Sequence, residues 1–172
     1  YFSNLTINNS EDTVFLHDDT VYVTKKIHFQ KGKIDVGGGV LHLKRTSYAW
    51  GTLEGELDEE DSSSYVFGAP GYIKMYRPLT LGTTYENLHH SGIGLTVNGN
   101  LGARTEIRRY HVADSIPSNG SIARQFQFYP QSPDVVSDVK MHYIDTNGLQ
   151  GNTASQLAVF TSGDNGSTWR KL

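Results

Sequence analysis

Seven aromatic side chains in the first half of the chain are the residues best suited to contact a ligand. They lie in or beside segments rich in glycine and serine. A ring that stacks on the C–H face of a sugar is the usual basis of a glycan-binding surface, although a protein core or a subunit interface uses the same rings. The group comprises Tyr48, Trp50, Tyr65, Phe67, Tyr72, Tyr76 and Tyr85, of which we expect Trp50, Tyr48, Tyr72 and Tyr76 to bind a ligand.

The acidic stretch at residues 54–61 is a second candidate for chemistry. Paired carboxylates hydrolyse glycosidic bonds, and carboxylate oxygens bind calcium. The spacing fits neither an EF-hand loop nor a pair presented by a helix, and three serines follow it, so a solvated loop is favoured. Glu54, Glu56 and Asp58 are the weak catalytic candidates, and the prediction is that this chain has no catalytic residues.

Histidine and cysteine offer little further chemistry. The chain has no cysteine, which excludes disulfides, zinc–thiolate sites and thiol nucleophiles. The seven histidines are scattered, and the adjacent pair His89 and His90 would point to opposite faces of a strand. We therefore expect no metal and no cofactor.

A specific local motif lies near the C-terminal end. Ser162, Asp164, Gly166, Thr168 and Trp169 match the Ser-x-Asp-x-Gly-x-Thr-Trp pattern of an Asp-box. In this pattern the aspartate accepts hydrogen bonds from its own turn, the glycine permits a positive φ, and the tryptophan folds back as an apolar plug. The motif predicts a well-made β-hairpin, which is a structural role.

Composition and charge restrict the class of protein. Lys and Arg number 15 against 18 Asp and Glu, a net charge of -3, which lacks the basic excess expected for nucleic-acid binding. Apolar runs stay well short of the roughly 20 residues of a membrane span, so no membrane insertion is expected. The chain begins at Tyr1 and not at Met, and we expect it to be a piece of a longer protein.

Period-two alternation predicts an all-β protein. In residues 20–30 the apolar Val21, Val23, Ile27 and Phe29 share one face, and glycine turns follow at residues 31–32 and 37–39. Short strands divided in this way indicate a meander or a stacked β-arrangement, with a β-sandwich-like region overall. Residues 104–112 suit an edge strand or an intersubunit surface, the Asn98-Gly99 pair predicts a hairpin, and residues 121–172 read as an antiparallel meander.

This pattern predicts two regions in the chain and the assembly of several copies of it. Residues 1–91 form an N-terminal β-rich region with long aromatic and acidic loops, and residues 92–172 form a C-terminal antiparallel region that ends in the Asp-box hairpin. The first fifty residues are short strands with little apolar content and many glycines, and such strands rarely stand alone. We therefore expect an intertwined or side-by-side homotrimer.

Two short segments carry a resemblance to a family. Residues 95–101, LTVNGNL, look like a sequence segment that is common in the shafts of bacteriophage tail fibres and tailspikes, and residues 33–43 have a similar residue pattern. Together with the Asp-box, the chain resembles the C-terminal part of a phage tailspike or tail fibre. The resemblance implies a β-rich homotrimer on the virion tail, outside the cell, whose tip attaches to a bacterial surface polysaccharide or another host receptor.

Two alternatives stay open beside this receptor-binding function. The chain could be a fragment of a polysaccharide-degrading tailspike, a glycoside hydrolase or lyase that uses the acidic stretch. It could also be a free-standing carbohydrate-binding β-sandwich. Solution mass separates a trimeric fibre from a monomeric module, and release of reducing ends from a polysaccharide tests for an enzyme.

Overall fold

The computed structural model describes residues 1–47, 50–56, 64–80, 83–86, 92–112, 115–116, 119–120, 122–130, 136–143, 149, 151–164 and 166–172. These residues form strands joined by turns, and their one helical element is a short 3-10 turn, η1 (Ala154–Gln156). The all-β prediction is confirmed.

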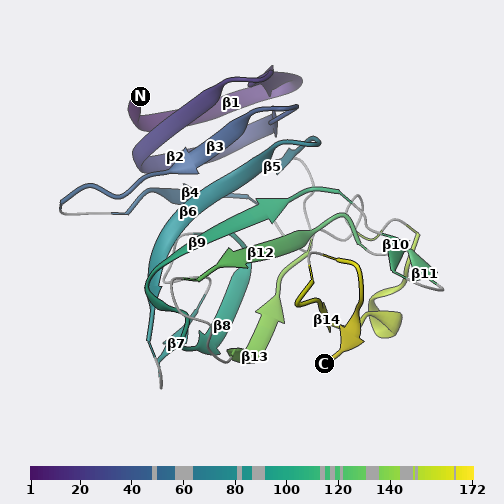
Figure 1. The fold of residues 1–172 in the computed structure, drawn as a ribbon. Coiled ribbons are helices and arrows are strands. Elements are labelled where there is room, and N and C mark those ends of the chain that lie inside the picture. The colour runs from purple at the N-terminus through teal and green to yellow at the C-terminus, as the bar shows by residue number, and fades with distance from the viewer. Residues whose placement is uncertain are drawn as a thin grey trace.

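The N-terminal half is a stack of parallel coils, that is, a small β-solenoid (Figure 1). Strand β1 (Phe2–Phe15) pairs in parallel with β2 (Thr20–Asp35), which bends through three segments. The first segment pairs with β3 (Val40–Leu43), the second with β4 (Thr52–Glu54) and the third with β5 (Ser64–Phe67). Strand β6 (Tyr72–Leu79) then pairs in parallel with β3 and adds the next coil to the stack. Of the two arrangements expected for these residues, the stacked one is observed. The turn predicted at residues 31–32 is a bend within β2, where Gly32 has a φ of 104°.

The coils stack because their inward side chains form apolar columns. Val23 pairs with Leu43, Leu43 with Met75, and Met75 with Ile107 in the next strand along, and all four are fully buried. Burial of such side chains is the main force that holds neighbouring coils together. The alternation read from residues 20–30 is confirmed, because Val23, Ile27 and Phe29 are buried and Lys25 is exposed.

One corner of the stack is built from residues without side chains. The amide of Gly39 donates to the carbonyl of Val36, and the amide of Gly71 donates to the carbonyl of Gly37. A Cβ at residue 39 would come within 2.6 Å of the carbonyl oxygen of Asp19, and one at residue 71 within 2.4 Å of that of Gly39. Glycine is required there because the backbones of successive coils touch.

Antiparallel strands close the end of the stack away from β1 (Figure 1). Strand β9 (Gly102–Tyr110) pairs with β6, and β12 (Gln125–Tyr129) pairs with β9. The main sheet therefore continues across the boundary predicted at residue 91. Strand β9 lies between two partners, so the prediction of an edge strand was wrong.

Three smaller sheets complete the described fold. Strand β8 (Leu95–Gly99) lies between β7 (Thr84–Tyr85) and β13 (Val136–Met141), while β10 (Ser115–Ile116) pairs with β11 (Asn119–Gly120) and β14 (Phe160–Thr161) with β15 (Arg170–Lys171). Strands β8 and β9 belong to different sheets, so the hairpin predicted at Asn98-Gly99 is wrong. Strands β12 and β13 are likewise in different sheets and do not form one meander.

Candidate functional site

The outward side of the main sheet carries a continuous set of aromatic and charged side chains. Alternation in β3, β6, β9 and β12 points one set of residues into the core and the other set outward. We call the outward set the aromatic–basic face. Its members are Tyr1, Tyr22, His42, Lys44, Tyr72, Lys74, Tyr76, Arg104, Glu106, Arg108, Tyr110 and Tyr129.

Glu106 organises the centre of this face. Its carboxylate accepts a hydrogen bond from the hydroxyl of Tyr76 at 2.5 Å and one from Nε of Arg108 at 2.6 Å, and it pairs with Lys74 at 3.2 Å. Burial alone would raise the pKa of Glu106, but these three partners outweigh it and hold the pKa below its usual value. The carboxylate is therefore charged and fixed, and it orients the rings and cations around it.

Cations lie over the tyrosine rings next to Glu106. The guanidinium of Arg108 lies 4.7 Å from the ring centre of Tyr72 and 4.4 Å from that of Tyr129. Arg104 lies 4.6 Å from the ring of Tyr76. Such contacts hold each ring and cation in a defined position. The face thus presents ordered rings with positive groups beside them.

A second row of rings crosses the stacked coils. Tyr1 stacks on Tyr22 with centroids 4.4 Å apart, Tyr22 lies 5.2 Å from His42, and His42 lies 5.8 Å from Tyr76. Burial, with the neighbouring Lys74 and Lys44, lowers the pKa of His42 to about 4. His42 is consequently neutral at physiological pH and acts as another flat ring of the row.

The charge of this face differs from that of the whole chain. It holds four cations and one carboxylate, whereas the chain has a net charge of -3. Rings offer surface for stacking on C–H groups, and the cations attract acidic groups. The face can therefore stack on the C–H groups of a ligand and attract its acidic groups.

The residues predicted to bind a ligand are divided by the structure. Tyr72 and Tyr76 belong to the aromatic–basic face, and Tyr48 lies outside the described residues. Trp50 lies elsewhere, and the guanidinium groups of Arg45 and Arg77 lie over its ring, at 4.5 Å and 4.1 Å from the ring centre. Of the remaining rings, Tyr85 is buried, while Tyr65 and Phe67 pack together on β5.

Sequence reasoning missed the charged half of the face. Arg104, Glu106 and Arg108 occupy every second position of β9, and Lys74 lies between Tyr72 and Tyr76 at the same spacing in β6; that spacing was the available signal. Only the antiparallel register, which sets Tyr76 opposite Glu106, brings them together.

The predicted carboxylates point to different surroundings. Glu54 is partly exposed and pairs with Lys26 at 2.8 Å, whereas the side chain of Glu56 is only 6% exposed. Gly55 lies between them with a φ of 76°, which redirects the chain. Asp58 lies outside the described residues.

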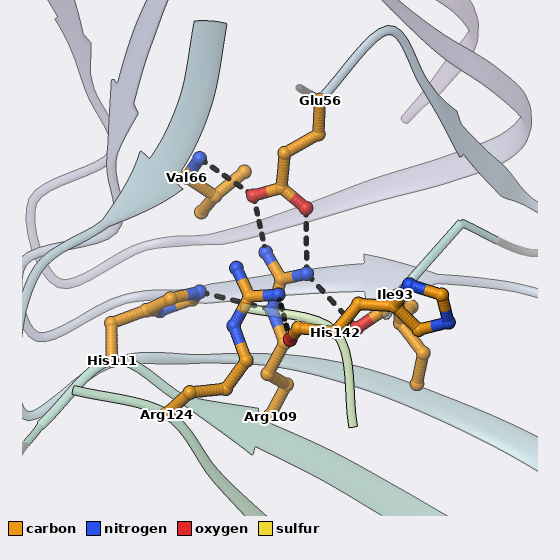
Figure 2. Close-up of polar contacts among 7 residues, drawn as sticks. All are labelled: Glu56, Val66, Ile93, Arg109, His111, Arg124 and His142. Atoms are coloured by element: carbon orange, nitrogen blue, oxygen red, sulfur yellow. Dashed lines mark hydrogen bonds and ion pairs between the residues drawn. The ribbon is translucent and has the colours of Figure 1, made fainter. Parts of the chain in front are cut away.

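Glu56 is part of a buried polar cluster centred on Arg109 (Figure 2). Nη1 and Nη2 of Arg109 donate to its two carboxylate oxygens, each at 2.6 Å, and Nη1 also donates to the carbonyl of Ile93 at 3.0 Å. Nε of Arg109 donates to Nε2 of His111 at 3.1 Å, and the amide of Val66 donates to Glu56 at 2.9 Å. Four hydrogen bonds engage all three nitrogens of this guanidinium, so we interpret the cluster as a structural one.

Electrostatics agree with a structural role for the cluster. Burial alone would raise the pKa of Glu56, but Arg109 and Arg124 hold it below its usual value. Burial, together with the same two arginines, lowers the pKa of His111 well below its usual value. Arg124 donates in turn to the carbonyl of His142 at 2.6 Å. A neutral histidine and a charged carboxylate therefore coexist beside two guanidinium groups.

The Asp-box residues form the expected turn between β14 and β15. Asp164 accepts hydrogen bonds from the amide and hydroxyl of Thr168, at 2.8 Å and 2.6 Å, and from the hydroxyl of Ser162 at 2.7 Å. These bonds lower the pKa of Asp164 to about 2. Gly166 has a φ of 85°, and Trp169 is half-buried. The motif acts here on its own turn.

In the comparison with known proteins, no family model, curated protein or solved structure matches the chain. Within the described residues, no group of three or more His, Cys, Asp and Glu side chains is placed to hold a metal ion. The described part of the chain also holds no helix of the length and hydrophobicity that a membrane crossing needs.

Proposed function

We propose that this chain is a receptor-binding part of a bacteriophage tailspike or tail fibre, located on the virion tail, and that it attaches to a polysaccharide of the bacterial surface. The observation that supports the proposal most is the aromatic–basic face, in which Tyr72 and Tyr76 lie beside Lys74 and Arg108. Parallel coils are stiff and present repeated side chains in rows, which suits contact with a repeating polymer.

The same proposal includes a homotrimer. Strand β1 lies at the end of the main sheet and exposes large apolar side chains: Phe2 is 46% and Phe15 is 56% exposed. An exposed edge strand of this length favours pairing with another chain. Sedimentation equilibrium of the purified chain tests this part, and a monomer at micromolar concentration would contradict it.

Binding to purified capsule or lipopolysaccharide tests the attachment function. Tyr76→Ala removes a ring from the middle of the face, and Arg108→Gln removes the cation that spans Tyr72 and Tyr129. Both variants should reduce retention on the polysaccharide severalfold. The matched control is Tyr65→Ala, because Tyr65 is also half-buried under a cation, Lys33 at 5.0 Å, but lies on β5 outside this face.

The proposal fails if both variants, folded as judged by circular dichroism, bind as tightly as the unmodified chain. A neutral polysaccharide serves as the second control, since the cations of the face should add nothing to its binding. A reducing-end assay on the same samples separates attachment from cleavage.

A further inference from the structure

Arg77 is a buried guanidinium whose hydrogen-bonding capacity is mostly unused. It points inward from β6 and is 2% exposed. Its Nη1 donates to the carbonyl of Tyr76 at 3.0 Å, while Nε and Nη2 have no hydrogen-bond partner among the described residues. Buried polar groups are nearly always hydrogen-bonded, so two nitrogens without a partner on one side chain require an explanation.

The two free groups lie on the same edge of the guanidinium. Nε and Nη2 present parallel N–H bonds, which is one of the two forks that bind a carboxylate through both of its oxygens. Arg109, one strand away, uses its other fork for Glu56 in this way. Arg77 therefore has the donor geometry of a carboxylate pair without the carboxylate.

The surroundings of Arg77 add positive charge and a flat ring. Trp50 lies over Arg77 at 4.1 Å, and Arg45 lies over the same ring at 4.5 Å. Among the described residues neither guanidinium forms an ion pair with a carboxylate. Burial, and then repulsion from Arg45, lower the pKa of Arg77 to about 10, which still leaves it charged at neutral pH.

The two residues on the Trp50 side of Arg77 are less buried than Arg77 itself. Arg45 is exposed and Trp50 is half-buried, and the two residues pair by an isolated antiparallel bridge. Both guanidinium groups lie over the ring of Trp50, so a ligand that displaces this ring would meet both cations. Stacking surface and two positive groups then contact one ligand.

We propose that Arg77, Arg45 and Trp50 form a binding site for a carboxylate group, and that its ligand is a carboxylate-bearing sugar such as a uronic acid. The free edge of Arg77 holds both carboxylate oxygens, Arg45 adds the second charge, and Trp50 packs on the sugar ring. This site is separate from the aromatic–basic face, and it does not depend on attachment to a bacterial surface.

Fluorescence of Trp50 provides a direct readout. The chain has two tryptophans, so the Trp169→Phe variant leaves Trp50 as the only one. Sodium glucuronate, sodium acetate and sodium chloride are titrated into this variant at matched ionic strength, with glucose as the neutral control. We expect a saturable change in emission with glucuronate, a weaker one with acetate, and none with chloride or glucose.

Substitution of the arginine identifies the site. Arg77→Met in the Trp169→Phe background should weaken glucuronate binding about tenfold or more, since it removes a charge-assisted bidentate pair. Lys33→Met is the matched control and should leave binding unchanged, because Lys33 also lies over an aromatic ring, that of Tyr65, but belongs to neither proposed site. Should Arg77→Met not fold, Arg45→Met provides a second test, with a smaller loss expected.

The proposal is overturned if glucuronate and chloride change the emission equally, or if the response survives in both Arg77→Met and Arg45→Met. Equal affinities for acetate and glucuronate would retain the carboxylate site but remove the sugar as its ligand. Failure of polysaccharide attachment with a normal glucuronate response would count against the proposed function alone.

Discussion

Arg109 on β9 and Arg77 on the neighbouring strand β6 both point into the protein interior, and both are almost completely buried. Arg109 donates to Glu56, Ile93 and His111, and so its charge is fully compensated. Arg77 donates to one carbonyl and otherwise contacts a tryptophan ring. The difference indicates that the first guanidinium serves the fold, while the second keeps donors for a partner from outside.

The largest effect is expected from breaking the compensated pair. Glu56→Gln leaves the buried Arg109 without its counter-charge, which should lower the free energy of unfolding by about 3–5 kcal/mol. Urea denaturation measures the loss. The matched control is Glu54→Gln, two residues earlier, whose partly exposed pair with Lys26 is worth about 1 kcal/mol or less. Similar losses in the two variants would contradict the structural role of the Glu56–Arg109 pair.

Acid should destabilise the compensated cluster in two stages. The pKa of His111 lies well below its usual 6.5 in the folded chain, so below pH 6.5 the unfolded chain binds more protons and stability falls. The lowered pKa of Glu56 adds a second loss as the pH falls below its usual 4.5. Urea midpoints between pH 3 and 8 measure both stages.

The same pH series, measured on variants, distinguishes the role of Arg109 from that of Arg77. Glu56→Gln should lose the second stage and keep the first, whereas Arg77→Met should keep both, since no carboxylate of the described residues pairs with Arg77. A pH profile of Glu56→Gln that coincides with that of the unmodified chain below pH 4.5 would refute this assignment.

Replacing the uncompensated arginine should have a small effect of opposite sign. Arg77→Met removes a buried charge but also its contact with Trp50, so the free energy of unfolding should stay within about 1 kcal/mol of the unmodified chain, on the stabilising side. Thermal and urea unfolding in buffer without carboxylates measure it. A loss as large as that of Glu56→Gln would mean that Arg77 is structural.

The smallest effect is expected at the Asp-box, where Asp164 and Thr168 are exposed and the flanking strands form a two-stranded sheet of their own. Asp164→Asn weakens the acceptor for the amide and hydroxyl of Thr168. Hydrogen exchange of the Thr168 amide should become faster, with the global unfolding midpoint unchanged. A lowered midpoint would instead tie this turn to the stability of the coils.

Local patterns in the sequence predicted strands but neither their lengths nor their partners: short strands were expected in the first fifty residues, whereas β1 and β2 run for 14 and 16 residues. The alternation at Val23, Ile27 and Phe29 correctly predicts which side chains are buried. It cannot distinguish a meander from parallel coils, because both bury every second residue, and the partner of Val23 is Leu43, one coil away. The hairpin predicted at Asn98-Gly99 failed for the same reason, since tertiary pairing overrides a local turn signal.

The candidate sites depend on still longer separations. Glu56 and Arg109 are 53 residues apart, and neither has an alternation or motif that identifies the other. Tyr72 and Tyr76 were found because rings are conspicuous, whereas the cations beside them needed the register of β6 with β9. Arg77 gave no signal, because an unpaired buried charge is recognised only when its surroundings are known.

The glycine corner has a consequence for finding relatives of this chain. Residues 39 and 71 occupy the same corner one coil apart, and a methyl group at either would strike the backbone of the coil above. At this pitch the two positions admit only the smallest residue, whatever residues lie between them. A search for two glycines at the spacing of residues 39 and 71, with alternating apolar positions between them, can detect relatives whose overall sequence similarity is low.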